Sequence, residues 1–302
     1  MPSRDRLMRL GAAAEKLMTT RVARVLARIL LLAGLVFVAL RARSLWRGSQ
    51  IDFERVDWGM LAGAFALAVA GTAAAAAIWL AILEALGVRT RWRWITLFFQ
   101  SQLGKYIPGS VWQYAGRASA AHAHGVPVKP VGVSLPVEFT ASGLAAGSMA
   151  AFFLGWWGGA CVGAGALLVL ACARRAGSGR PVVRAAVRAT LLYLPVWLVF
   201  GASFWLVAHG LVQVSPADLG FYTGAFAVAW LAGLLAVYAP GGLGVREAVL
   251  VALLSSRIGA ADALVVAAGS RLSMLLADVV LAALATVAVR PGPPRLDLVD
   301  SA

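Results

Sequence analysis

The stretch that decides the fold is residues 104–117, GKYIPGSVWQYAGR, where a Pro-Gly pair interrupts an apolar region between two cations. Pro108 and Gly109 disfavour a continuous helix, because proline lacks a backbone donor and glycine is conformationally free. Lys105 precedes the break and Arg117 follows it. Broken backbone inside a bilayer is tolerated only where protein or a water-filled cavity satisfies the freed polar groups. The stretch is therefore either a surface loop or a site within the membrane.

The composition is that of an integral membrane protein. The 302-residue chain is 61% hydrophobic and only 13% charged, whereas soluble domains are about 45–50% apolar and about 25% charged. The net charge of +14 indicates arginine-rich cytoplasmic loops rather than nucleic-acid binding, because a chain this apolar offers no soluble basic face. Its histidines form no metal-spaced cluster, so we expect neither a metal site nor a cofactor.

Six apolar segments are long enough to cross a bilayer, which takes about 17–25 helical residues. These predicted spans are 22–40, 59–83, 130–154, 157–173, 187–210 and 261–289. Two further regions, 94–124 and 219–257, are apolar but broken at Pro108-Gly109 and at Pro240-Gly241-Gly242. Each breaks into pieces of roughly 13–19 residues, which are typical of re-entrant helices rather than of crossings.

The basic residues favour cytoplasmic N- and C-termini. If both broken regions return to the side that they leave, the arginine run 174–188 lies inside. If the first broken region crossed, that run would lie outside, which the positive-inside rule disfavours. The loop 41–58 carries both signs of charge and fits less well. We expect a cytoplasmic basic N-terminus at 1–21, a cytoplasmic tail at 290–302, and a place in the cell (inner) membrane.

The two halves of the chain repeat. Tyr106-x-Pro108-Gly109 recurs as Tyr238-x-Pro240-Gly241, an offset of 238 − 106 = 132 residues. The same offset makes the first three spans nearly coincide with the last three. Three crossings in each half require opposite orientations in the membrane. We therefore predict an all-α polytopic membrane protein with six spanning helices and two re-entrant broken-helix hairpins in an inverted-topology repeat, 22–154 and 155–289. Such repeats are typical of transporters.

Each break places a half-helix N-terminus at membrane depth, where its positive dipole end favours an anion such as phosphate. The predicted phosphate-binding residues are Arg117, Arg246, Lys105, Ser110, Gly109, Gly241 and Gly242. The predicted cavity or coupling residues are Glu138, Glu247, Arg271, Asp278, Gln113, Tyr106 and Tyr238, and Pro108 and Pro240 serve as the helix breaks. Glu138 and Arg271 hold nearly equivalent repeat positions, so we expect them to face each other across the pseudo-two-fold axis.

Structural roles are the alternatives for these residues. Lys105 also suits the neutralisation of a helix dipole, and the buried charges also suit the locking of a bundle. Trp112 and Tyr114 suit an aromatic belt at the membrane interface.

The two broken stretches, GKYIPGSVWQYAGR and YAPGGLGVREAVLVALL (238–254), resemble the lysylphosphatidylglycerol synthase transmembrane-region family. That family includes the flippase portion of the bacterial multiple peptide resistance factor and many stand-alone membrane proteins. The resemblance covers most of 20–290 and implies a lipid translocase that moves an anionic or modified lipid between leaflets. Some relatives are associated with cell-envelope glycan synthesis, which implies polyprenyl-phosphate-linked sugars as another cargo. Bifunctional members continue into a soluble aminoacyl-transferring domain, whereas this chain reaches Ala302 after a short Pro-rich tail, so we do not expect synthase activity.

The function expected from these features is translocation of an anionic, phosphate-bearing lipid or a polyprenyl-phosphate-linked sugar, without enzymatic activity. A membrane glycosyltransferase with a polyprenyl-phosphate donor is the rival, and Asp52, Glu54 and Asp57 in the first outer loop are its candidate bases. An enzyme, however, gives no reason for two symmetric breaks. A third alternative is a non-catalytic partner of an envelope enzyme that modifies lipids or builds glycans.

Overall fold

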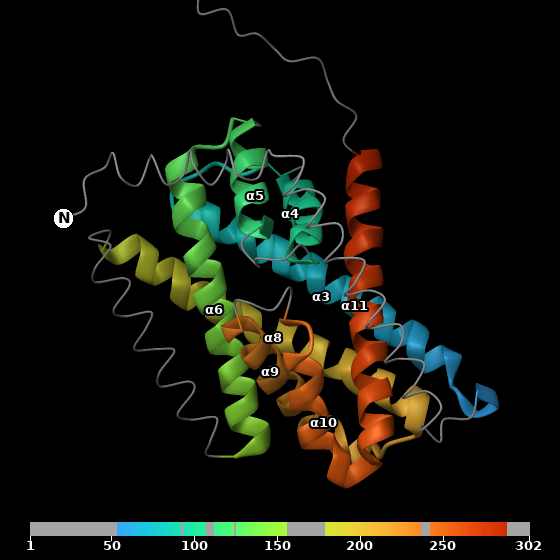
Figure 1. Ribbon diagram of the computed structural model, residues 1–302. Helices are drawn as coiled ribbons and strands as arrows, with labels where there is room; N and C mark the ends of the chain where they lie inside the picture. Colours follow the sequence, from blue (N-terminus) through green and yellow to red (C-terminus); the bar gives the residue numbers. More distant parts are fainter. Residues whose placement is uncertain are drawn as a thin grey trace, which may run out of the picture.

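The computed structural model describes residues 53–91, 94–106, 112–123, 125–155, 179–236 and 242–288. Within these ranges the regular structure is entirely helical, without a β-strand (Figure 1). The α-helices are α3 (Trp58–Ala85), α4 (Ile95–Gln102), α5 (Trp112–Ala123), α6 (Val128–Leu154), α8 (Gly179–Val212), α9 (Leu219–Leu235), α10 (Val245–Ile258) and α11 (Ala260–Ala288). Three 3-10 turns accompany them, η1 (Phe53–Arg55), η3 (Leu103–Tyr106) and η4 (Pro216–Asp218).

Five helices in the described part of the chain are long and apolar enough to cross a membrane, which is the pattern of a multi-pass membrane protein. They are Trp58–Ala85, Lys129–Leu154, Pro181–Val212, Pro216–Leu235 and Ala260–Val287. Four of them coincide with predicted spans. The fifth falls in the broken region 219–257, because η4 lengthens the apolar helix α9 to 20 residues. The predicted spans 22–40 and 157–173 and the terminal segments 1–21 and 290–302 lie outside the described residues, so the count of six spans and the re-entrant hairpins stay predictions.

The centre of the fold is the crossing of α3 and α8, which small residues allow to approach closely. Asp57 starts α3 as its N-cap, and its Oδ1 accepts a hydrogen bond from the Met60 backbone at 3.0 Å. Gly71 faces the ring of Phe200, and a Cβ at Gly71 would come within 2.5 Å of that ring. The Ser203 hydroxyl on α8 donates to the carbonyl of Ala64 on α3 at 2.7 Å.

The contacts of the two halves match in pairs. Helix α6 packs against α8 and α9, and α11 packs correspondingly against α3 and α4. Helix α4 pairs with α5 as α9 pairs with α10. In Figure 1 α6 runs downwards and α11 runs upwards, and α3 and α8 also run in opposite directions. This is the arrangement that an inverted repeat produces, while its full extent over 22–154 and 155–289 stays a prediction.

Each half contributes one hairpin of shorter helices. In the second, Arg257 Nη1 lies 2.6 Å from Asp218 Oδ1, so the end of α10 returns to the start of α9. In the first, Arg117 of α5 donates from Nε to the Ser101 hydroxyl of α4 at 3.1 Å. Figure 1 shows α4 and α5 towards one end of the bundle and α10 towards the other.

Candidate functional site

A cavity of about 330 Å³ lies where the two hairpins approach each other. Its volume falls in the range of about 300–1,000 Å³ that is usual for small-molecule sites. Thr72, Ser142, Trp197 and Ser270 line it, and each lies near the middle of one of the four long helices α3, α6, α8 and α11. The cavity therefore lies near the middle of these helices.

Most of the described residues that the sequence nominated lie at this cavity. Arg117, Arg246, Lys105, Gly242, Glu138, Glu247, Arg271, Gln113 and Tyr106 all line it. Asp278 is buried and contacts two of them. Pro108, Gly109, Ser110, Tyr238, Pro240 and Gly241 lie outside the described residues. Arg117 and Arg246 line the same cavity, although the two side chains are held differently, and the roles predicted for the site residues stay predictions.

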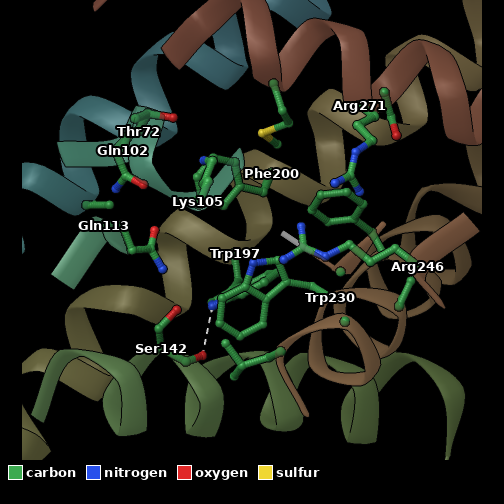
Figure 2. A pocket seen from close by; sticks show the side chains of 18 of the residues that line it. Thr72, Gln102, Lys105, Gln113, Ser142, Trp197, Phe200, Trp230, Arg246 and Arg271 are labelled. Atoms are coloured by element: carbon green, nitrogen blue, oxygen red, sulfur yellow. Dashed lines mark hydrogen bonds between the residues drawn. The ribbon is translucent and has the colours of Figure 1, made fainter. Parts of the chain in front are cut away.

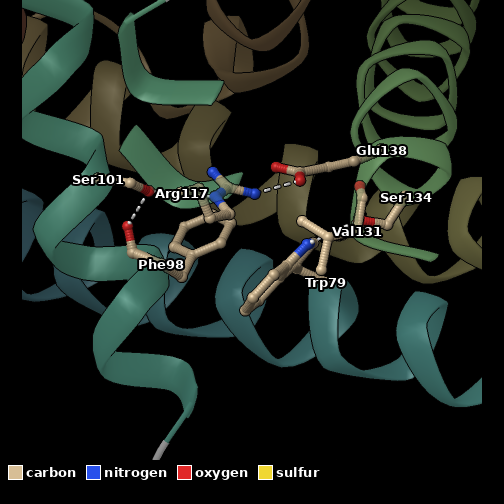
Figure 3. Close-up of polar contacts among 7 residues, drawn as sticks. All are labelled: Trp79, Phe98, Ser101, Arg117, Val131, Ser134 and Glu138. Carbon is tan, nitrogen blue, oxygen red and sulfur yellow. Dashed lines mark hydrogen bonds and ion pairs between the residues drawn. The ribbon is translucent and has the colours of Figure 1, made fainter. Parts of the chain in front are cut away.

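Arg117 is locked in a buried ion pair with Glu138 (Figure 3). Only 1% of its surface is exposed, its Nε donates to Ser101, and its guanidinium lies 4.1 Å from the centroid of the Phe98 ring. These contacts fasten α5 to α4 on one side and to α6 on the other. The Glu138 carboxylate neutralises the charge of Arg117 within the protein. We therefore interpret Arg117 as a structural part of the cavity wall.

Asp278 fastens the tip of the first hairpin to α11. Its Oδ2 lies 2.7 Å from Lys105 Nζ and accepts a hydrogen bond of 2.7 Å from the Tyr106 hydroxyl. Both partners belong to η3, which directly precedes the break, and the Asp278 side chain is 1% exposed. One carboxylate oxygen thus holds two groups of η3.

Glu247 has two partners in the second half. Its Oε1 lies 2.9 Å from Arg271 Nη1, and its Oε2 accepts a hydrogen bond of 2.6 Å from the backbone N–H of Gly244. The second contact is a capping interaction at the start of α10. The amide at this half-helix N-terminus, expected to be free for an anion, is therefore already bound to the chain's own carboxylate.

The predicted pairing of Glu138 with Arg271 is wrong. Glu138 pairs with Arg117 and Arg271 pairs with Glu247, each within its own half. The reason is the packing of adjacent elements, since α5 lies on α6 and α10 lies on α11. Glu138 and Arg271 therefore each pair with an opposite charge on the hairpin beside them and not with each other across the two-fold axis.

Arg246 is the cation that this pairing leaves over. Among the described charged residues at the cavity, Lys105, Arg117 and Arg271 each contact a carboxylate, whereas Arg246 contacts none. Its Nε is buried without a hydrogen-bond partner, and its guanidinium carbon lies 5.7 Å from the centroid of the Trp230 ring. The described cavity therefore carries one surplus positive charge.

Two glycines make room for the Arg246 side chain. A Cβ at Gly233 would lie 2.5 Å from both Cγ and Nε of Arg246. A Cβ at Gly242 would lie 3.0 Å from the same Nε, and Gly242 has a φ of +72° that favours glycine. The arginine thus passes between α9 and the start of α10 to reach the cavity, over the face of Trp230 (Figure 2).

Sequence reasoning named Tyr106 and Gln113 but missed the other aromatic and neutral polar residues of the wall. Trp197 donates from Nε1 to the Ser142 carbonyl at 3.0 Å, and its ring packs edge-to-face on Trp230 at 4.9 Å. Tyr114, expected at the membrane interface, lines the cavity instead. In an apolar sequence nothing distinguishes an aromatic residue that faces a cavity from one that faces lipid.

No model of a known protein family, no curated protein and no solved structure matches the chain. The resemblance to the lysylphosphatidylglycerol synthase transmembrane-region family therefore stays a prediction.

Proposed function

We propose that the protein is a membrane lipid translocase that binds the phosphate of an anionic lipid at Arg246. The observation that carries this proposal is the surplus positive charge of Arg246. Three carboxylates form ion pairs with the other three of the four cations in the described cavity. A buried charge without a partner is strongly unfavourable. Ionisable groups at membrane depth usually serve function. A bound anion would offset the cost of burying the charge of Arg246 and would account for an arginine at this position.

Phosphate suits this position better than a simple halide. The guanidinium presents a planar fork of donors that matches the oxygens of a phosphate, and such charge-assisted hydrogen bonds are strong. The cavity lies at mid-height among helices long enough to cross a membrane. A lipid places its headgroup there while its acyl chains stay in the bilayer.

Translocation follows from the matched hairpins. One hairpin reaches the cavity from each end of the bundle, and each is fastened by polar contacts to α11, through Asp278 or through Arg271. Alternate release of the two hairpins opens the same site first to one leaflet and then to the other, as in transporters built from inverted repeats. The rival enzyme stays an alternative. Asp57, one of its candidate bases, caps α3, and Asp52 lies outside the described residues.

The orientation belongs to the same proposal. The described basic residues Arg89, Arg91, Lys129, Arg184 and Arg188 follow the end of α3 or lie in the first turns of α6 and α8. The positive-inside rule places that end in the cytoplasm, together with both chain termini.

The test is lipid transfer between leaflets in liposomes that contain the purified protein. A fluorescent phosphatidylglycerol is bleached from outside by dithionite, so the extent and rate of bleaching report transfer. Arg246→Gln should slow transfer about 10- to 100-fold, because charged hydrogen bonds are worth about 1.5–3 kcal/mol each. Arg257→Gln is the matched control, since Arg257 lies on the same helix, outside the cavity, and pairs with Asp218. Unchanged transfer by Arg246→Gln would refute the proposal.

A further inference from the structure

We infer, on the basis of the proposed function, that the ion pair between Glu247 and Arg271 is a latch that the bound anion opens. This pair fastens the start of α10 to α11 beside the cavity. An anion held at Arg246 draws Arg271 away from Glu247, and the start of α10 then separates from α11. Binding of the ligand thus causes the release that its transfer requires.

Of the three ion pairs that involve residues of the described cavity, this latch is the pair least protected by the protein. Both of its side chains are partly exposed, at 17% for Glu247 and 20% for Arg271. Each of the other two pairs has one side chain that is only 1% exposed, Arg117 in one and Asp278 in the other. Separating a pair with a buried member leaves an uncompensated buried charge, whereas a partly exposed pair is weak. Glu247–Arg271 is therefore the pair that a competing anion can separate.

Glu247 keeps a partner when Arg271 leaves. Its Oε2 accepts a hydrogen bond of 2.6 Å from the Gly244 backbone, which caps α10. A carboxylate at a helix N-terminus is also stabilised by the helix dipole, and α10 is 14 residues long. Only Oε1 loses its ion-pair contact with Arg271. The carboxylate therefore remains compensated after the latch opens.

Arg271 finds its new partner beside Arg246. Both side chains line the cavity and extend into it, one from α11 and the other from α10 (Figure 2). Their charges act on each other, and the charge of Glu247 acts on Arg246 as well. Two cations that repel each other are stabilised by an anion that they share, and each guanidinium offers several donors to its oxygens. Such an anion competes directly with Glu247 for Arg271.

The arrangement of α10 and α11 converts this exchange into a movement. Gly259 alone separates the two helices, and its φ of +81° favours glycine. Glu247 and Arg271 each lie twelve residues from Gly259 (259 − 247 and 271 − 259), which is about 18 Å along either helix. The latch therefore lies far from the turn about which α10 can swing. A rotation of about 15° at that radius would move the start of α10 by about 5 Å.

The inference is tested by measuring the distance between spin labels at Ala248 and Leu276 by electron paramagnetic resonance, in a background that lacks Cys161 and Cys172. Both labelled residues are exposed, one on α10 and the other on α11. The full chain is placed in phosphatidylcholine nanodiscs with or without phosphatidylglycerol. Phosphatidylglycerol should lengthen the mean distance in the wild type by about 3–5 Å. Glu247→Gln, which keeps a side-chain acceptor for the start of α10, should show the longer distance without phosphatidylglycerol.

Two variants serve as controls. Asp218→Asn is the matched control, because Asp218 pairs with Arg257 in the same hairpin but outside the cavity. This variant should give the wild-type distances with and without phosphatidylglycerol. Arg246→Gln should show the short distance under both conditions, because no anion is then held beside Arg271.

The outcomes separate this inference from the proposed function. Lengthening that needs Arg246 and is already present in Glu247→Gln supports the latch. An unchanged wild-type distance, when mass spectrometry shows lipid bound through Arg246, overturns the latch and leaves the phosphate site intact. A short distance in Glu247→Gln without phosphatidylglycerol also overturns the latch, since the pair then does not hold the hairpin. Phosphatidylglycerol binding that Arg246→Gln does not weaken overturns both.

Discussion

Replacing either member of the buried pair Arg117–Glu138 should destabilise the protein far more than replacing both. Glu138→Met leaves the guanidinium of Arg117, 1% exposed, against Phe98 without a counter-charge. Removing one partner of a buried pair costs about 3–5 kcal/mol, whereas replacing both by apolar groups of similar volume is close to neutral. Arg117→Met should cost a similar amount, plus about 1 kcal/mol for the lost hydrogen bond to Ser101. The double-mutant cycle should therefore give a coupling energy of about 3 kcal/mol or more.

The assay is the free energy of unfolding in bicelles for the wild type, the two single variants and the double variant. The pair Arg257–Asp218 is the control, because its side chains are 45% and 31% exposed. Exposed pairs are worth about 0–1 kcal/mol. A coupling energy for Arg117 and Glu138 within that lower range would refute the assignment of a buried, locked pair. The same cycle on Glu138 and Arg271 should be additive, since they have different partners.

Two further perturbations test how the cavity is built. Gly233→Ala should slow lipid transfer at least tenfold, because the new methyl group would overlap the Arg246 side chain, which lies 2.5 Å from its position. Gly143→Ala is the control, since the nearest neighbour of its methyl group would lie 4.0 Å away. This control variant should transfer lipid as the wild type does in the same liposome assay. Asp278→Asn should lower the free energy of unfolding by about 1.5–3 kcal/mol, because it removes the charged contact of Lys105, whose side chain is 29% exposed. Thermal unfolding in detergent measures this, and an unchanged midpoint would argue against the contact.

The sequence was informative where a single physical signal determined the outcome. Apolar length located the helices that correspond to 59–83, 130–154, 187–210 and 261–289, because a bilayer sets the length of a span. Length does not decide between a re-entrant limb and a span at α9, because η4 extends this apolar helix to 20 residues. The shared cavity of Arg117 and Arg246 followed from the cost of charge at membrane depth.

The partners of each charge could not be predicted. The repeat offset predicts nearly equivalent positions for Glu138 and Arg271, but equivalent positions meet only on the symmetry axis. Both side chains contact a neighbouring hairpin instead. Nothing in the sequence shows that Gly233 admits the side chain of Arg246, since that contact joins two helices across a break. The ion pairs therefore depend on how the helices pack, which the sequence does not show. The surplus charge of Arg246 is evident only once the partner of each carboxylate is known.

The central claim is that the positive charge of Arg246, which has no carboxylate partner among the described residues, makes the cavity a phosphate site. Substitutions that remove and then restore this net charge test the claim most directly. Phosphatidylglycerol binding is titrated in neutral nanodiscs for the wild type, for Arg246→Gln and for Arg246→Gln combined with Glu247→Gln. The single change should weaken binding about 10- to 100-fold. The second change removes the carboxylate 2.9 Å from Arg271 and so restores a surplus of one positive charge in the cavity. It also keeps a side-chain acceptor for the start of α10, so binding should recover in part. Wild-type affinity in Arg246→Gln, or no recovery in the double variant, would contradict the account.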